Sequence, residues 1–317
     1  MATNNATNNT PSIPVAVSQG GTSTNTLTAH GVIVGNTTSA VNVTAAGTDG
    51  QLLVGVTSAD PAFGSTAAAD FTFTTATAGA TRTLTVSNTD NSSGASNAEL
   101  LVSVGGASAG DPVITFAVGG TTNWTMGADN SVTSPNADPF VIAASAALGT
   151  TNVMSVDITG NVSLPLTPAF LGVLGTTDTA VTGDGTAFTI GTGHAYTEEF
   201  DQGSNFNPAT GVFTSPTAGI YYFCGMVLLG SVGALHTSET FTLTHSTFVF
   251  FGNYASPALM RDINNNVSYT VGVFVSMAAA DTAKLIITVS GSTKTVDVVG
   301  GTPSTNSVTY FSGYLAC

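Results

Sequence analysis

Short apolar segments recur along this chain, and each of them ends at turn residues. Between residues 71 and 159 these segments are four to seven residues long, and Gly, Asn or Asp stands in the stretches that separate them. Thr, Val and Phe suit a pleated sheet, whereas Gly and Asn adopt the positive φ of tight turns. No long window repeats its apolar residues with the 3.6-residue period of a helix. The sequence therefore predicts an all-β protein.

The scarcity of charge supports this prediction and excludes one class of function. Only 7% of the residues are charged, against about 25% in ordinary soluble domains, so the Lys, Glu and Arg that usually cover helices are missing. The net charge is −14, and Arg82, Arg261, Lys284 and Lys294 are the only permanent cations. A protein that binds nucleic acid needs clustered cations. We therefore exclude nucleic acid as a partner.

The sequence also bears on cellular location. No apolar run reaches the roughly 18 to 20 residues that span a bilayer, and the first ten residues lack the basic and apolar regions of a secretory signal. We expect such a protein to reach the outside by lysis, by a dedicated apparatus or within a virus particle. Cys224 lies in an aromatic segment and is expected to be a buried small apolar residue, while Cys317 ends the chain. Two such cysteines do not make a disulfide framework.

Two motifs in the C-terminal half point to a known family. Phe213-Thr-Ser-Pro precedes Gly219-Ile-Tyr-Tyr-Phe, and Tyr310-Phe-Ser-Gly-Tyr-Leu stands near the end of the chain. Their order and spacing resemble the C1q/TNF-like superfamily. The resemblance implies a jelly-roll head over residues 167–317 that assembles as a homotrimer. It also implies that aromatic residues of the last strands form the trimer core, for which the candidates are Tyr221, Phe223, Tyr310, Phe311 and Tyr314.

The N-terminal half carries a second resemblance. Ser96-Asn-Ala-Glu-Leu, Ala109-Gly-Asp-Pro-Val-Ile-Thr-Phe and Gly160-Asn-Val are similar to elements of phage tail-fibre shafts. This implies an elongated trimeric β stalk. One chain with such short strands buries too little apolar surface to fold alone, so we expect identical chains to intertwine. Trp124 is predicted to anchor the stalk core.

The expected organisation has three parts. Residues 1–61 form an N-terminal tail and an intertwined attachment segment, residues 62–166 form the β-rich shaft, and residues 167–317 form the head. Two prolines in Leu164-Pro-Leu-Thr-Pro168 mark the boundary between shaft and head.

No residue set in the sequence predicts catalysis. Gly106-Ala-Ser-Ala-Gly110 has the Gly-x-Ser-x-Gly pattern of a hydrolase nucleophile elbow, but Asp111-Pro112 prevents the helix that must follow. His194, His236 and His245 lack zinc-like spacing, so we interpret them as surface or loop residues that bond to the backbone. We therefore predict that the protein is not an enzyme.

One acidic cluster is a candidate metal site. Glu198, Glu199 and Asp201 lie close together in sequence and offer the oxygen ligands that calcium prefers. The alternative is a solvated loop. Calcium is the only cofactor that the sequence suggests.

The leading hypothesis is a structural fibre or adhesin protein of a virion tail or extracellular appendage. Its N-terminus would attach to other appendage or virion proteins, and its head would bind a glycan or protein receptor on a cell surface. Loops on a rigid β scaffold often carry recognition, and Tyr254, Asp262 and Asn264 are the receptor-loop candidates. The alternatives are an extracellular filament subunit joined head to tail and a polysaccharide depolymerase.

Overall fold

The structure is a computed structural model that describes residues 15–16, 20–56, 58–65, 78–79, 81–119, 122–132, 138–302 and 305–317. The chain divides into two units, Met1–Glu99 and Leu100–Cys317, which we describe separately. The predicted polar tail, residues 1–12, and the predicted strand Phe71–Thr74 lie outside the described residues.

The first unit holds two small antiparallel hairpins. In one, β1 (Ile33–Val34) pairs with β2 (Asn42–Val43), and in the other β3 (Leu52–Val56) pairs with β4 (Ala59–Gly64). Among the described residues of this unit, no large apolar side chain is buried. The described part of this unit therefore has no hydrophobic core within a single chain.

Two predicted strands are not formed. Residues 83–86 and 98–104 belong to no strand, although their apolar residues are typical of strands. A strand needs a neighbouring strand to bond with its backbone N–H and C=O groups. Among the described residues of a single chain, no strand pairs with these two segments.

The second unit begins with a five-stranded antiparallel meander. Each strand pairs with the next one along the chain, as expected when short turns join antiparallel strands. The strands are β5 (Val113–Val118), β6 (Thr122–Ala128), β7 (Phe140–Ala143), β8 (Asn152–Val156) and β9 (Val162–Ser163). The first four coincide with apolar segments of the sequence, whereas β9 was not predicted. Val141 and Ala143 are buried on one face of this sheet with Leu148 and Val113 against them.

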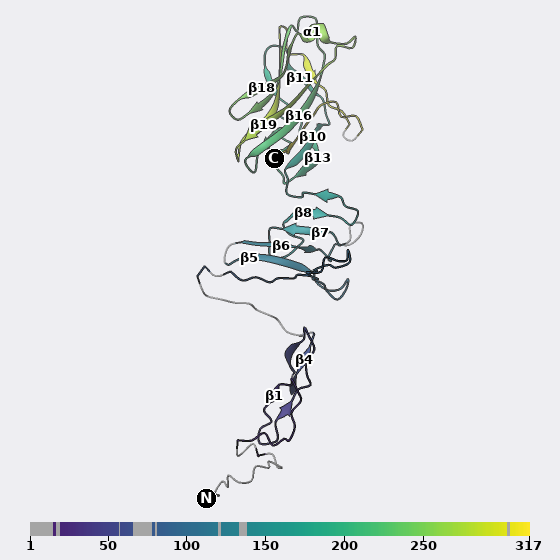
Figure 1. The fold of residues 1–317 in the computed structure, drawn as a ribbon. Helices are drawn as coiled ribbons and strands as arrows, with labels where there is room; N and C mark the ends of the chain where they lie inside the picture. Colours follow the sequence, from purple (N-terminus) through teal and green to yellow (C-terminus); the bar gives the residue numbers. More distant parts are fainter. Residues whose placement is uncertain are drawn as a thin grey trace, which may run out of the picture. The chain divides into compact units, whose positions relative to one another are not determined.

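Two packed sheets follow (Figure 1). The first sheet contains β10 (Ala169–Leu174), β13 (Tyr196–Gln202), β16 (Gly219–Gly230), β19 (Val267–Met277) and β22 (Tyr310–Leu315), with β11 (Asp178–Thr182) and β21 (Val296–Val298) at one end. The second contains β14 (Phe206–Asn207), β15 (Val212–Thr214), β17 (Ser238–His245), β18 (Val249–Ala255) and β20 (Thr282–Ser290), with β12 (Ala187–Thr189) beside β20. The one helix of the described residues, α1 (Pro257–Met260), has four residues, and no described helix could cross a bilayer.

The strand order is that of a jelly roll. We count the eight principal strands in chain order as β10, β15, β16, β17, β18, β19, β20 and β22. The first sheet then has the order 1-8-3-6 and the second has 2-7-4-5. Two antiparallel sheets connected in this way form a double Greek key. The all-β fold predicted from the sequence is therefore confirmed.

Aromatic residues fill the space between the two sheets. Phe170 stacks on Phe206 with ring centroids 4.5 Å apart, and Phe311 meets Phe170 edge-on at 5.0 Å. Gly313 is required at this point, because a Cβ atom there would lie 2.5 Å from the ring of Phe223. The residues from 207 to 211 make the predicted turn, with Gly211 at φ +65°.

Candidate functional site

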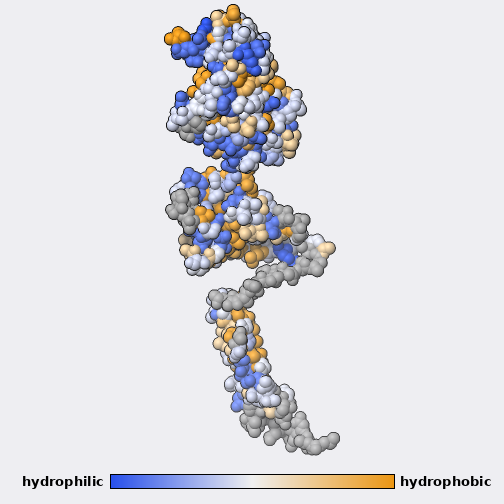
Figure 2. Space-filling view, turned by 180° about the vertical axis from the view of Figure 1, so that it is seen from behind, coloured by the Kyte–Doolittle hydropathy of each residue, from blue (hydrophilic) through white to orange (hydrophobic). Residues whose placement is uncertain are grey.

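The outer face of three strands of the first jelly-roll sheet, β16, β19 and β22, is aromatic and uncharged. Because side chains alternate along a strand, the residues between the core positions of β16, β19 and β22 point away from the interior. Tyr222 lies between Tyr314 and Phe274, with ring centroids 5.8 Å and 4.9 Å away. No outward side chain of these three strands is charged. In Figure 2 hydrophobic residues appear among the hydrophilic ones on the visible side of the jelly roll.

This aromatic face continues onto β10 and β13. A hollow of about 440 Å³ lies there, lined by Leu171, Phe200, Tyr222 and Tyr314 among others. Phe200 is paired with Leu171 across the strands and is 52% exposed. Apolar surface of this kind commonly marks a contact with another protein. We define the aromatic face as the outward residues Leu171, Phe200, Tyr222, Phe274, Tyr310 and Tyr314.

A second apolar surface lies at the edge of the other sheet. β18 is the last strand of that sheet, and its residues Val249 and Phe251 are exposed. An unprotected apolar edge strand tends to associate with another chain. The jelly roll thus carries two different apolar surfaces, the aromatic face and the β18 edge.

The predicted trimer-core residues divide into two groups. Tyr310 and Tyr314 lie on the aromatic face, as a contact between copies requires. Tyr221, Phe223 and Phe311 are instead buried in the interior of one chain. Their selection was wrong, because alternation along β16 and β22 sends every second aromatic residue inward and sequence proximity alone does not separate the two faces.

The loops around α1 lie at the end of the jelly roll opposite the C-terminus (Figure 1). Ala258 N donates to His236 O (3.0 Å), and Val232 N donates to Asn265 O (3.0 Å), so the two loops are bonded together. Leu235, Leu259 and Ile263 are exposed in them, the last at 97%. We call residues 231–237 and 254–266 the apical loops.

The receptor-loop candidates Asp262 and Asn264 fall in loops, whereas Tyr254 lies in β18, next to the end of that strand, so its prediction as a loop residue was wrong. Tyr254 is 76% exposed. Asp262 has another role, because its Oδ1 accepts the backbone N–H groups of Asn264 and Asn266, both at 2.8 Å. These bonds, the one from Asn266 first, lower the pKa of the Asp262 carboxyl. Asp262 therefore holds the turn that presents its neighbours.

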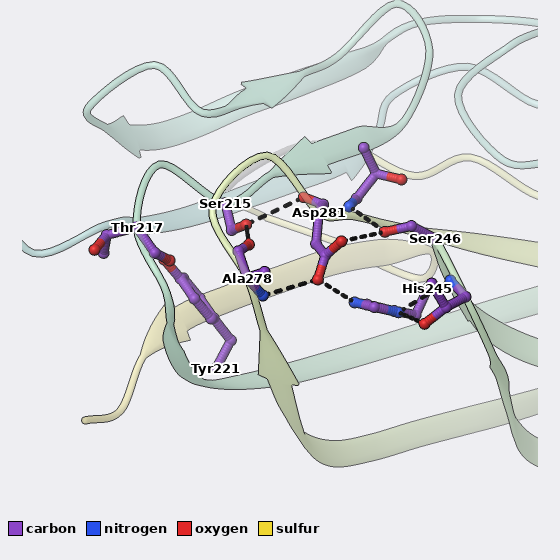
Figure 3. Close-up of polar contacts among 9 residues, drawn as sticks. Ser215, Thr217, Tyr221, His245, Ser246, Ala278 and Asp281 are labelled. Carbon is purple, nitrogen blue, oxygen red and sulfur yellow. Dashed lines mark hydrogen bonds and ion pairs between the residues drawn. The ribbon is translucent and has the colours of Figure 1, made fainter.

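A polar network joins three turns at the other end of the jelly roll (Figure 3). Asp281 Oδ2 accepts the N–H of Ala278 (2.8 Å), and Oδ1 accepts the hydroxyl of Ser246 (3.1 Å). Ser215 Oγ donates to the carbonyl groups of Ala278 and Asp281. The bond from Ala278 is the main reason why the pKa of Asp281 is lowered. The network fixes the β15–β16, β17–β18 and β19–β20 connections relative to one another.

His245 belongs to this network and is buried. Its Nδ1 accepts the backbone N–H of Thr247 (3.2 Å), and its Nε2 lies 3.3 Å from Asp281 Oδ2. In the neutral ring Nε2 therefore carries the proton. Since both ring nitrogens face groups of the turns, the geometry supports a structural role for His245.

The other two predicted histidines are also held in place. His236 is buried, accepts the N–H of Gly233 at Nδ1 (2.8 Å) and approaches Thr293 O with Nε2 (3.2 Å), so it bonds to the backbone as predicted but lies inside. His194 Nδ1 lies 2.6 Å from the buried carboxylate of Asp178. No group of three metal-binding side chains occurs in the described part of the chain.

The suggested calcium ligands are not brought together. Both carboxylate oxygens of Asp201 face a turn and accept the N–H groups of Asn205 (3.2 Å) and Phe206 (2.9 Å). Glu198 is paired with Gly172, and Glu199 is the extra residue of a bulge in β13. Their proximity in sequence reflects the turn and the bulge, so the structure contradicts this set as a calcium site.

Glu239 is a buried acid that sequence reasoning missed. It is 1% exposed, and its Oε2 accepts Asn253 Nδ2 (3.1 Å). Burial raises the pKa of its carboxyl to about 7. The signal in the sequence is weak, because Glu239 stands between Ser and Thr at the start of β17, where a solvent-facing acid is equally plausible.

Sequence reasoning also missed Phe274 and Phe200. Phe274 could have been found, since it replaces a small or polar residue in the alternation of β19, where Ser268, Thr270 and Gly272 occupy the same face. Phe200 is hidden in a strand of acidic residues, and only pairing with Leu171 places it on the aromatic face.

The remaining sequence features form no site. The residues from 106 to 110 form a loop that runs into β5 with no helix after it. Cys224 and Cys317 are free thiols, and Cys224 is half-buried on the same side of the sheet as Tyr310, 3.9 Å from its hydroxyl.

Among the comparisons with known proteins, only the comparison with solved structures found matches. No family model matches the chain, and no curated protein matches it. The globular domain of zebrafish complement 1qA is 17% identical over 47% of this chain and 98% of its own length, with a TM-score of 0.30. Murine APRIL at pH 8.5 is 10% identical with the same coverage of both chains and the same TM-score.

Proposed function

We propose that this protein is a non-enzymatic structural subunit of a fibrous appendage, carried on a virion tail or outside a cell. Its jelly roll forms a homotrimer, and its apical loops bind a receptor on a cell surface. The single observation that carries the proposal is the aromatic face: a broad uncharged surface on a chain whose net charge is −14.

The two apolar surfaces of the jelly roll suit a closed ring. A cyclic trimer uses a heterologous contact, in which one surface of each copy meets a different surface of the next. The aromatic face and the β18 edge supply such a pair. The number three comes from the resemblance to the C1q/TNF-like superfamily.

Recognition falls to the apical loops, because they lie at the end opposite the C-terminus and are held by hydrogen bonds between loops. Their most exposed large apolar side chains are those of Ile263 and Leu259, at 97% and 87%, followed by Tyr254. We expect the receptor, a surface protein or glycan, to present an apolar patch, since Tyr and apolar side chains contribute most when water is excluded from them. The N-terminal unit would attach to other appendage or virion proteins.

Assembly is tested by sedimentation of the full chain. For the wild-type protein we expect a sedimenting mass three times that of one chain. The variant Tyr222→Asp should sediment at a lower mass, because it places a charge on the aromatic face. Thr214→Asp is the matched control, since Thr214 is exposed on the second sheet. A wild-type protein that stays monomeric at all concentrations refutes the proposal.

Recognition is tested separately on assembled protein. Labelled protein is bound to intact bacterial cells and to immobilised glycans. Ile263→Asn and Tyr254→Ala should weaken binding without changing the mass, whereas Thr214→Asp should leave both unchanged. Electron microscopy of the same samples distinguishes discrete particles from open-ended filaments, and release of oligosaccharide from the glycans would indicate a depolymerase.

A further inference from the structure

The five-stranded sheet of the second unit has one face on which large apolar side chains predominate and none is charged. In the antiparallel register, residues directly opposite each other share a face. Phe116 is opposite Trp124, Met126 is opposite Ile142, and Phe140 is opposite Val156. We call this the shaft face. Its large side chains are Ile114, Phe116, Val118, Trp124, Met126, Phe140, Ile142, Met154, Val156 and Val162.

The chain covers only the opposite face of this sheet. There Val141 and Ala143 are buried completely, with Leu148 packed on them. On the shaft face Phe116 is 57% exposed and Trp124 is 44% exposed, and Val118, Phe140 and Val162 are exposed as well. In Figure 2 the part of the chain that holds this sheet shows hydrophobic residues at its surface.

The exposed apolar area of the shaft face is large for a single sheet. With about 150–250 Å² for each aromatic side chain, the five exposed residues leave on the order of 500 Å² of apolar surface in water, which is near the upper end of what monomers expose. Removing apolar surface from water is favourable in proportion to the area covered. Covering the shaft face would therefore stabilise the protein.

We propose that the shaft face packs against the shaft faces of other copies of this chain, so that their sheets enclose a shared interior around Trp124. This inference rests on the self-association in the proposed function, but it concerns a different surface. An identical chain is the one partner that is present in equal amount whenever the protein is made. Since no shaft-face side chain is charged, copies with a net charge of −14 can meet there without like charges in contact.

The segment before the sheet also lacks partners that another copy would supply. Residues 98–104 belong to no strand, and Leu100 and Leu101 are exposed within it. A single chain thus leaves apolar side chains of this segment exposed and gives it no strand partner among the described residues.

Trp124 is the only tryptophan of the chain, so its fluorescence reports on the shaft face alone. The full-length protein is diluted while its mass is followed by sedimentation and its Trp124 emission by acrylamide quenching. In the assembled protein we expect blue-shifted emission and several-fold weaker quenching than in the dissociated chain. Equal quenching in both states would overturn the inference.

Two variants test the shaft face at a single protein concentration, without dilution. Phe116→Asp places a charge on the shaft face beside Trp124, whereas Ala117→Asp places one on the opposite face of the same strand, where Ala117 is also exposed. Quenching should rise in Phe116→Asp and stay low in Ala117→Asp. If both variants behave alike, the shaft face is not a contact.

The outcomes separate this inference from the proposed trimer of jelly rolls. If Tyr222→Asp loses assembly while Trp124 stays protected in Phe116→Asp, the jelly-roll contact is supported and the shaft contact is refuted. If Trp124 becomes exposed in Phe116→Asp while Tyr222→Asp keeps its mass, the shaft contact is supported and the jelly-roll contact is refuted. A wild-type monomer with freely quenched Trp124 would refute both.

Discussion

Glu239 is a carboxyl group enclosed in the interior of the jelly roll, where ionisation is unfavourable. Its Oε1 and the hydroxyl of Tyr269 are both buried without a hydrogen-bond partner among the described residues. Burial raises the pKa of Glu239 from an ordinary 4.5 to about 7. The folded state therefore keeps a proton that the unfolded state releases between those two values.

This difference predicts a pH-dependent stability. The folded state binds more protons between about pH 4.5 and 7, so the contribution of Glu239 is most favourable below pH 4.5, decreases as the pH rises and levels off above 7. The full effect is about 3 kcal/mol. Glu239→Gln cannot ionise, so the stability of this variant relative to wild type should increase over the same range in urea unfolding. A difference that does not change between pH 5 and pH 8 would contradict this assignment.

At the scale of the element, β16 serves two functions with its two faces. Phe223 points into the core, against Phe213 and Phe311, and Tyr222 points out from the aromatic face. The same alternation makes Phe170, Phe213 and Phe311 structural residues. Neighbouring residues in the sequence therefore differ in role.

Substitution of these two neighbours should separate folding from assembly. Phe223→Ala leaves a cavity among packed rings and should lower the free energy of unfolding by about 3–5 kcal/mol. Tyr222→Ala should have little effect on the unfolding of a dissociated chain but should weaken self-association. Denaturant unfolding at low protein concentration and sedimentation at high concentration measure the two effects. Equal losses of stability in both variants would show that Tyr222 is also a core residue.

At the scale of the whole molecule, charge opposes assembly while the contact surfaces do not. Each copy has a net charge of −14, so bringing copies together costs electrostatic free energy. The proposed contact surfaces, namely the shaft face and the outward residues of β16, β19 and β22, are uncharged. Ion pairs therefore do not hold the copies together, and added salt has none to weaken. The repulsion between copies comes from their net charge and acts over a long range.

Association should therefore strengthen with salt. The Debye length falls from about 30 Å at 0.01 M to about 8 Å at 0.15 M, which screens the repulsion between copies. The apparent dissociation constant, measured by sedimentation at both ionic strengths, should be lower at 0.15 M. Weaker association at higher salt would mean that ion pairs hold the copies together, contrary to the proposed contacts.

Residue patterns alone determined the β class of this protein and the position of many strands. The spacing of Phe213, Pro216 and Gly219 predicted β15 and the start of β16, and apolar runs predicted β5 to β8. These features are local, since strand propensity and turn chemistry act over a few residues.

Only the tertiary structure decided which aromatic residues lie inside, because that depends on which strands pair and which face the opposite sheet covers. Pairing with β10 placed Phe200 on the aromatic face, and pairing between β6 and β5 placed Trp124 beside Phe116. It also showed that the carboxylates of Asp201 and Asp262 accept hydrogen bonds from the backbone of turns. Burial is a property of residues distant in sequence, so no local pattern could supply it.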